Sequence, residues 1–215
     1  MKIQTVEYAG TIVDPGAALP GSLPQIAFAG RSNVGKSSLI NTLLLRTRKK
    51  MAHVSARPGK TRAVNFFQVN DRFFLVDLPG YGFAKVPDQM RDDWARLVEG
   101  YLSRPDGPRA VVQLVDARRD PTESDLQMLR YLASLKVPAL VALTKIDKLS
   151  RSERSTRLRT LPEALGLAPE QVIPFSSKTG EGREVLLASM DDLLSDLDGG
   201  TPPSPGVGTT KGGWA

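Results

Sequence analysis

A glycine-rich stretch after an apolar segment has the residue types needed to hold phosphate. Residues 30–37 read GRSNVGKS and fit the pattern G-x-x-x-x-G-K-[ST]. Its glycines let main-chain N–H groups point at phosphate oxygens, while the lysine adds positive charge and the serine offers a hydroxyl to Mg²⁺. The dipole of the helix expected to follow also favours an anion. A coincidental glycine turn is the alternative. The predicted phosphate loop comprises Gly30, Arg31, Ser32, Asn33, Val34, Gly35, Lys36, Ser37 and Ser38.

A carboxylate and a Pro-Gly turn follow a second apolar segment, residues 73–76. A carboxylate at the end of a parallel-sheet strand can face a phosphate site and reach Mg²⁺. A glycine there lets its main-chain N–H approach a γ-phosphate. Capping of a turn by Asp77 is the alternative, which its position one strand away from the phosphate loop disfavours. We therefore add Asp77, Leu78, Pro79 and Gly80 to the predicted site.

Two short segments later in the chain could recognise a base. Thr144-Lys145-Ile146-Asp147 follows the apolar run 139–143, and Phe175-Ser176-Ser177 follows the run 172–174. An aspartate can accept two hydrogen bonds from guanine N1–H and its 2-amino group, which adenine does not present. The stem of Lys145 can cover the base, and main-chain N–H groups near Ser176 can reach guanine O6. Taken singly, Asp147 could cap a helix and the serines could form a polar loop.

The elements that must position these residues alternate along the chain. Short apolar, β-branched runs predict strands, and amphipathic stretches between them predict helices. This alternation indicates an α/β fold with a mostly parallel sheet and helices on both faces. The short link at residues 70–71 predicts one antiparallel hairpin. The six expected strands are 25–29, 63–69, 73–77, 110–115, 139–143 and 172–174, and the five helices are 36–46, 89–103, 122–135, 151–165 and 181–197.

Composition excludes several classes of protein. The chain has 215 residues, no cysteine and one histidine, which excludes disulfide frameworks, cysteine zinc sites, thiol nucleophiles and multi-histidine metal centres. No segment has 18 consecutive apolar residues and the N-terminus lacks an apolar signal run, so we expect a cytoplasmic protein without membrane attachment. A formal net charge of +6 is compatible with a polyanionic partner.

The chain divides into three parts. We expect residues 1–22 to form an N-terminal arm or short strand and residues 23–197 to form one nucleotide-binding domain. We expect residues 198–215 to be a disordered tail, because that segment is rich in Gly, Pro and Thr and poor in apolar residues. Residues 47–62 form a long, polar, basic stretch, and compact domains rarely keep such a loop without using it.

The motifs occur in the order and at the strand ends typical of translation-factor-related GTPases. The combination GRSNVGKSS, RPGKT, VNFF, LVDLPGYGFAKV, LTKIDKL and FSSKTG closely resembles the bacterial EngB (YihA/YsxC) family over almost the whole chain. The resemblance implies a Ras-like P-loop GTPase fold, Mg²⁺-dependent binding and hydrolysis of GTP, and a role in assembling the large ribosomal subunit. It also implies an association with cell division and septation, and we expect a monomer.

The resemblance also assigns roles to single residues. It aligns Thr61, in preference to Ser55, with the threonine that binds Mg²⁺ and senses the γ-phosphate. It thus implies Ser37, Thr61 and Asp77 at the metal, and Lys36, Thr61 and Gly80 in catalysis. Nucleotide contacts are further implied for Gly59, Lys60, Thr61, Arg62 and Ala63.

Two positions depart from the Ras pattern. Tyr81 stands where a water-positioning glutamine would be, so we expect slow intrinsic hydrolysis that a partner completes. Asn33 replaces a loop glycine; its side-chain carbonyl could hold K⁺ beside the phosphates, or the residue could simply tolerate the backbone angles of the loop.

Basic residues suggest where an RNA could bind. For the basic loop we favour contact with ribosomal RNA, because its order should depend on the γ-phosphate. For the helix 151–165 a solvated face is the slightly favoured alternative. The loop cluster comprises Arg46, Arg48, Lys49, Lys50, Arg57, Lys60 and Arg62, and the helix cluster Arg151, Arg154, Arg157 and Arg159.

Three other functions compete with this interpretation. The guanine motif argues against an ATP-dependent kinase. A nucleotide-binding module with negligible turnover remains open, as does a GTPase of tRNA modification or membrane transport.

Overall fold

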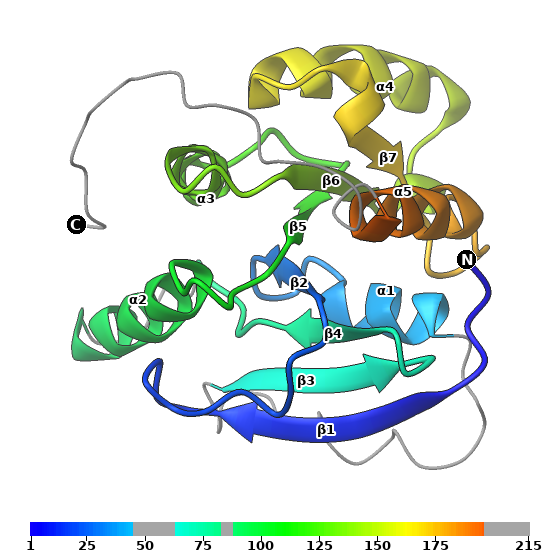
Figure 1. The fold of residues 1–215 in the computed structure, drawn as a ribbon. Helices are drawn as coiled ribbons and strands as arrows, with labels where there is room; N and C mark the ends of the chain where they lie inside the picture. Colours follow the sequence, from blue (N-terminus) through cyan, green and yellow to red (C-terminus); the bar gives the residue numbers. More distant parts are fainter. Residues whose placement is uncertain (45–62, 83–87, 196–215) are drawn as a thin grey trace.

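A computed structural model describes residues 1–44, 63–82 and 88–195 (Figure 1). They form one seven-stranded sheet in the order β1-β3-β4-β2-β5-β6-β7, with helices on both of its faces. The strands are β1 (Val6–Ile12), β2 (Gln25–Gly30), β3 (Val64–Val69), β4 (Phe73–Asp77), β5 (Ala110–Asp116), β6 (Ala139–Thr144) and β7 (Val172–Pro174). The α-helices are α1 (Lys36–Leu43), α2 (Asp88–Leu102), α3 (Glu123–Ser134), α4 (Arg151–Leu165) and α5 (Arg183–Ser195).

The expected α/β fold is confirmed, but the expected strand count of six is wrong. The N-terminal arm contributes β1, which pairs antiparallel with β3, from Val6 opposite Val69 to Ile12 opposite Val64. The sheet therefore has two antiparallel pairs instead of one. This strand lies at an edge, and only one of its seven residues, Ile12, is buried. An edge strand needs no continuous apolar run, so the periodicity of its sequence is weak.

The predicted hairpin between β3 and β4 is present. Asn70 and Asp71 both have left-handed backbone angles, with φ of 51° and 53°. Three residues, 70–72, separate the paired Val69 and Phe73, and positive φ at two successive turn residues matches the twist of the flanking strands. The Asn70 side chain also accepts hydrogen bonds from the main-chain N–H groups of Gln4 and Thr5, at 2.7 and 3.1 Å. The turn therefore fastens the chain that leads into β1.

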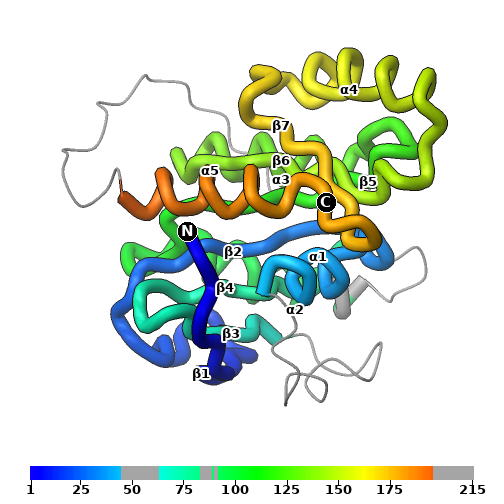
Figure 2. Tube along the Cα trace, turned by 90° about the vertical axis from the view of Figure 1, so that its right-hand side faces the viewer, coloured from blue at the N-terminus to red at the C-terminus, as the bar shows by residue number. Residues whose placement is uncertain are grey.

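Apolar side chains on the two faces of the sheet form separate layers. Ile26 and Phe28 of β2 pack with α1 and α5, whereas Ala27 and Ala29 of the same strand pack toward α2 and α3. Figure 2 shows α1 and α5 together on the first of these faces. A third apolar cluster joins α4 to β6 through Leu161 and neighbouring side chains. The result is a three-layer arrangement with a central strand, β2, buried along its whole length.

The parallel strands bring the predicted motifs to one edge of the sheet. Strand β2 is parallel to β4 and β5, and β6 is parallel to β5 and β7, so their carboxyl ends meet. In an open α/β sheet, ligands bind at this edge. Gly30, Asp77 and Thr144 end three of these strands.

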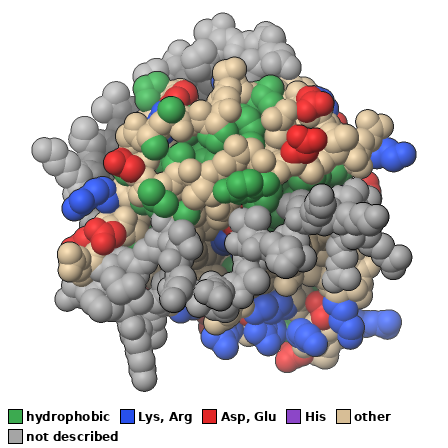
Figure 3. All heavy atoms as spheres, turned by 90° about the horizontal axis from the view of Figure 1, so that it is seen from below, with side chains coloured by type: hydrophobic (Ala, Val, Ile, Leu, Met, Phe, Trp, Pro, Cys, Tyr) green, Lys and Arg blue, Asp and Glu red, His purple; other side chains and the backbone are tan. Residues whose placement is uncertain are grey.

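The surface of the molecule on the side opposite α4 is partly apolar. Figure 3 looks at the molecule from below Figure 1, the side on which β1 lies, and shows apolar side chains in the middle of this face with charged ones around them. Tyr8 and Val13 are among the exposed large apolar residues. None of the helices within the described ranges is long and apolar enough to cross a membrane.

Candidate functional site

The phosphate loop joins the central strand to the first helix. Strand β2 ends at Gly30 and α1 begins at Lys36, with Gly35 before it at a φ of 107°. No acidic residue occupies the first turn of α1, so its main-chain N–H groups face no competing carboxylate there. Such a helix start can bind an anion. Ser37 and Ser38 are exposed at this end of the helix.

Lys36 and Asp77 form an ion pair within this edge of the sheet. Asp77 ends β4, opposite Phe28 of β2, and its Oδ1 contacts Lys36 Nζ. Both side chains are mostly buried, 12% and 18% exposed. The Asp77 carboxylate and the Ser37 hydroxyl are oxygen donors, which suit Mg²⁺. The described residues contain no cluster of three or more His, Cys, Asp or Glu side chains, so an ion here would draw other ligands from substrate phosphates and water.

Gly80 packs directly on the phosphate loop. The Ser32 N–H donates to the Tyr81 carbonyl over 2.9 Å, and the Tyr81 N–H donates to the Gly30 carbonyl over 3.3 Å. A Cβ atom at Gly80 would lie 3.2 Å from Ser32 Oγ and 3.3 Å from Ser32 N. A side chain at this position would press on Ser32, which would have to give by a few tenths of an ångström. The structure thus brings the predicted DLPG segment into contact with the predicted phosphate loop.

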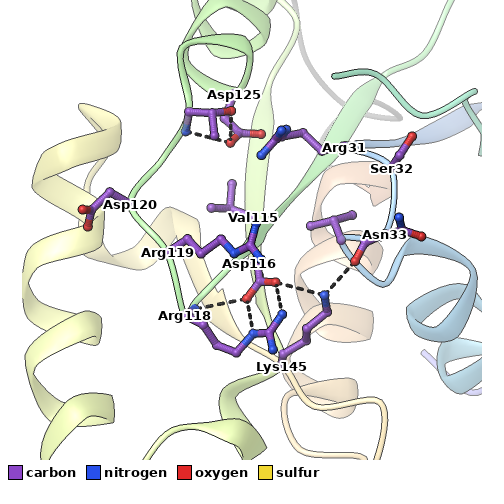
Figure 4. A pocket seen from close by; sticks show the side chains of 12 residues that line it. Arg31, Ser32, Asn33, Val115, Asp116, Arg118, Arg119, Asp120, Asp125 and Lys145 are labelled. Atoms are coloured by element: carbon purple, nitrogen blue, oxygen red, sulfur yellow. Dashed lines mark hydrogen bonds and ion pairs between the residues drawn. The ribbon is translucent and has the colours of Figure 1, made fainter. Parts of the chain in front are cut away.

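The predicted guanine motif is tied to the same loop. Lys145 Nζ donates to the Asn33 carbonyl over 2.7 Å and to Asp116 Oδ2 over 2.9 Å. The buried Thr144 donates its hydroxyl to the Val34 carbonyl over 2.7 Å. Figure 4 shows Lys145 between the loop and Asp116, beside an open pocket of about 260 Å³. The residues that follow β6 therefore hold the phosphate loop in place.

Asp147 is oriented by the last predicted segment. Ser176 is fully buried and donates its hydroxyl to Asp147 Oδ1 over 2.8 Å. The same hydroxyl oxygen accepts the main-chain N–H groups of Lys178 and Thr179, each at 3.2 Å. The carboxylate therefore keeps Oδ2 for another partner. The side chains of two other predicted site residues, Ile146 and Phe175, are buried in the apolar core, so these residues could reach a nucleotide only through their main chain.

Two charged side chains that line the pocket beside the phosphate loop were missed by sequence reasoning. Asp116 ends β5, and Arg118 donates to both of its oxygens, at 2.9 and 2.8 Å. Burial opposes ionisation of Asp116, but the hydrogen bonds from Arg118 and Lys145 outweigh it and hold the pKa of this carboxyl well below its usual range. A carboxylate at the end of an apolar strand was the signal that singled out Asp77, and it applies to Asp116 as well.

The two departures from the Ras pattern have defined surroundings. Tyr81 is buried, and its hydroxyl donates to Asp125 Oδ1 over 2.9 Å. Its ring therefore faces the interior and not the edge where the phosphate loop lies. Asn33 has a left-handed backbone with φ of 65°, and its side chain is exposed. Asparagine tolerates this backbone better than most residues.

Ion pairs occupy part of the basic cluster on α4. Arg154 pairs with Glu181, and Arg157 pairs with Asp120. Their charges are thus partly balanced within the protein, which strengthens the solvated-face interpretation of this helix. The basic loop and the predicted tail 198–215 lie outside the described residues. The predicted loop residues that are affected are Arg46, Arg48, Lys49, Lys50, Arg57, Gly59, Lys60, Thr61 and Arg62. Ala63 is buried at the start of the next described segment.

Comparisons with known proteins agree with this geometry. Residues 25–145 match a family model described as "50S ribosome-binding GTPase". The chain is 46% identical over 195 residues to a probable GTP-binding protein EngB of Citrifermentans bemidjiense, covering 91% of this chain and 90% of that protein. It is 50% identical over 187 residues to the EngB protein of Syntrophus aciditrophicus, covering 87% and 94%.

A solved structure shares the fold. The crystal structure of a probable GTP-binding protein EngB superposes with a TM-score of 0.66 at 26% identity, covering 80% of this chain and 99% of that one. Together with the relatives, it shows the family and the α/β fold of this chain. The chain belongs to the EngB family of GTP-binding proteins and is a GTPase.

Proposed function

We propose that this GTPase is a nucleotide-dependent switch in the assembly of the large ribosomal subunit. The observation that carries the nucleotide-binding part of the proposal is the contact of Lys145 with the Asn33 carbonyl, which joins the guanine motif to the phosphate loop. The family model that matches the chain is named for binding the 50S ribosome, which supports the choice of partner. By the same resemblance we propose a cytoplasmic monomer whose loss disturbs division and septation.

The phosphate and metal side of the site is assigned to residues at the carboxyl edge. Lys36 would neutralise the β- and γ-phosphates, which requires it to exchange its contact with Asp77 for phosphate. Ser37 and Asp77 would hold Mg²⁺, with Thr61 as the third protein ligand. When bound, Mg²⁺ neutralises the charge that develops on the phosphates. The Gly80 N–H would donate to the γ-phosphate.

The guanine side is assigned to the segments after β6 and β7. The free Oδ2 of Asp147 and its partnered Oδ1 would accept from guanine N1–H and the 2-amino group. An adenine base would leave this carboxylate without those donors, which disfavours an ATP-dependent kinase. The Lys145 stem, fixed at its end by Asn33 and Asp116, would cover the base.

Hydrolysis without a partner would be slow. The Tyr81 hydroxyl is held in the interior by Asp125, so it is not available to orient the attacking water. A partner, or a cation held by the Asn33 side chain, would complete the site. A turnover of tens per second by the isolated wild-type protein would contradict this part of the proposal.

The basic loop 47–62 would contact ribosomal RNA in the GTP state, because Thr61 lies within it. Phosphate contacts from such a loop give affinity with little sequence specificity. Hydrolysis would then change the affinity for the large-subunit precursor.

Depletion of the protein in cells tests the role in assembly. Ribosomal particles are separated on sucrose gradients after depletion, with wild-type protein or Lys36→Ala supplied from a plasmid. We expect depletion to reduce mature large subunits and accumulate lighter precursors, and only the wild-type protein to restore the profile. A normal ratio of the two subunits after depletion would contradict the role. A shift in tRNA modification alone would favour the alternative among RNA-related GTPases.

A further inference from the structure

The segment after Asp77 is fixed by a chain of buried hydrogen bonds that runs to helix α3. Gln113 of β5 donates its side-chain N–H to the Tyr81 hydroxyl, and this hydroxyl donates to Asp125 Oδ1 over 2.9 Å. Asp125 Oδ2 accepts from the N–H and the hydroxyl of Thr122, at 2.9 and 2.7 Å. The phenol therefore accepts one hydrogen bond and donates another, and a phenylalanine could do neither.

The surroundings of this chain leave little freedom to its members. Tyr81, Gln113 and Asp125 are 4%, 0% and 4% exposed. Burial and the charge of Asp125 raise the pKa of Tyr81 well above its usual value, so the phenol stays protonated and remains a donor. A buried polar group that loses its partner costs more than the hydrogen bond contributes when it is made. Tyr81 is therefore held at its hydroxyl by two elements of the core.

The aromatic ring and the main chain of this segment are held as well. The Tyr81 ring packs edge-to-face on Trp94, with ring centroids 5.8 Å apart. Trp94 Nε1 donates to the Pro79 carbonyl over 3.0 Å. The main chain of Tyr81 exchanges hydrogen bonds with Gly30 and Ser32 of the phosphate loop. Contacts on both sides of Gly80 thus fix the position of its N–H.

We propose that Tyr81 is a positioning residue for GTP hydrolysis, which acts through Gly80 by anchoring the segment 79–81 to Asp125 and Gln113. The side chain that replaces glutamine does not face the attacking water. It instead holds the Gly80 N–H against the phosphate loop, where an oriented donor to the γ-phosphate is needed. Preorganised donors act in catalysis only while their position is fixed. The inference rests on the proposed contact between Gly80 and the γ-phosphate, but not on any ribosomal partner.

The chain offers a matched control for the loss of a buried phenol. Tyr101 is fully buried, and its hydroxyl donates to Gln25 Oε1 over 2.7 Å. Gln25 begins β2, whereas the phosphate loop follows its other end. Tyr101→Phe thus removes a comparable buried hydrogen bond at the far end of the same strand. A purely structural role for Tyr81 predicts that Tyr81→Phe and Tyr101→Phe have the same consequences.

The test compares these two variants in GTP hydrolysis without ribosomes. The Trp214→Phe background makes Trp94 the only tryptophan of the chain. We expect both variants to lose thermal stability, but only Tyr81→Phe to lose about ten-fold in kcat with little change in KM, because small misplacements of reacting groups cost rates of this order. Only Tyr81→Phe should make Trp94 more accessible to acrylamide quenching. A kcat for Tyr81→Phe equal to or above that of Tyr101→Phe would overturn the inference.

A second variant covers the case in which Tyr81→Phe does not fold. Asp125→Ala removes the carboxylate, so the Tyr81 hydroxyl loses its anchor on α3 and Thr122 loses both of its contacts with Oδ2. We expect the same loss of kcat for this variant alone. Where Tyr81→Phe also folds, we expect no further loss in the double variant, because both changes break one chain of hydrogen bonds. Independent losses that add in the double variant would contradict the shared chain. Hydrolysis by wild type with no difference between the two tyrosine variants overturns the inference alone. A normal ratio of the two ribosomal subunits after depletion overturns the assembly role and leaves the inference standing.

Discussion

The ammonium group of Lys145 donates a hydrogen bond of 2.7 Å to the main-chain carbonyl of Asn33. This contact joins two segments 112 residues apart in the sequence. One belongs to the loop expected to hold phosphate and the other to the motif expected to recognise guanine. The Thr144 hydroxyl, which donates to the Val34 carbonyl over 2.7 Å, is a second contact between the same two segments. We therefore expect a change at either segment to affect the other.

Exchange of Asp147 for asparagine should change base preference. The amide would offer a donor where the carboxylate accepts, which disfavours guanine and suits the 2-oxo group of xanthine. We expect GTP affinity to fall by about 10²-fold or more and XTP affinity to rise, since unpaired buried polar groups discriminate strongly. Competition with a fluorescent nucleotide measures both affinities. Asp120→Asn is the control, since Asp120 is exposed and pairs with Arg157; unchanged guanine preference in Asp147→Asn would refute the assignment.

Two glycines beside the guanine loop provide a matched pair. Gly180 and Gly182 both have φ of 81°, so alanine strains the backbone at either position by about 1–2 kcal/mol. A Cβ at Gly182 would lie 2.0 Å from the Pro174 carbonyl oxygen, whereas at Gly180 it would meet nothing within 4 Å. We expect Gly182→Ala alone to weaken GTP binding and to destabilise the fold more. Equal nucleotide affinities for the two variants, measured by titration, would show that the clash does not reach the site.

The ion pairs of Asp116 should contribute to acid sensitivity. The pKa of this carboxyl is lowered in the folded state, so its stabilising effect is complete above the unfolded pKa of about 3.9 and is lost as the pH falls toward the folded value. We expect the difference in unfolding free energy between wild type and Asp116→Asn to be constant near neutral pH and to shrink below about pH 4. Urea unfolding at a series of pH values measures it. A difference that grows on acidification would have the wrong sign for this account.

Asn33 allows a test of a monovalent cation in hydrolysis. Its left-handed backbone suits glycine equally well, so Asn33→Gly removes the side-chain carbonyl and leaves the loop conformation unstrained. We expect wild-type protein to hydrolyse GTP faster in KCl than in NaCl and the variant to show no difference. Equal wild-type rates in the two salts would dispose of the K⁺ site and leave the backbone explanation of Asn33.

Local patterns predicted much of this molecule. The strand, glycine loop and helix around Lys36 depend on neighbours in the sequence, as does the hairpin turn at Asn70. The structure has all of them where the patterns indicate. Edge strand β1 was missed as a strand of the sheet because pairing with β3, and not its own apolar content, holds it in place. Spacing identified the segments that gather at the site, since parallel strands must bring their carboxyl ends to one edge.

Contacts between distant segments could not be predicted in this way. Nothing local indicates that Tyr81 is bonded to Asp125, 44 residues away, or that Ser176 orients Asp147. The sequence showed that a tyrosine replaces a glutamine, but only the structure shows that its hydroxyl is directed into the core. The position of Asp116 at a strand end was available as a signal; its partners Arg118 and Lys145 were not.

Co-sedimentation with purified ribosomal subunits tests the central claim most directly. The protein is loaded with a non-hydrolysable GTP analogue or with GDP and mixed separately with large and small subunits at two salt concentrations. The account predicts pelleting with the large subunit alone, and only with the GTP analogue, at both salt concentrations. Two results would contradict a nucleotide-dependent switch. One is binding that is the same with the GTP analogue and with GDP. The other is binding to both subunits that is lost as the salt concentration is raised, which indicates general charge attraction.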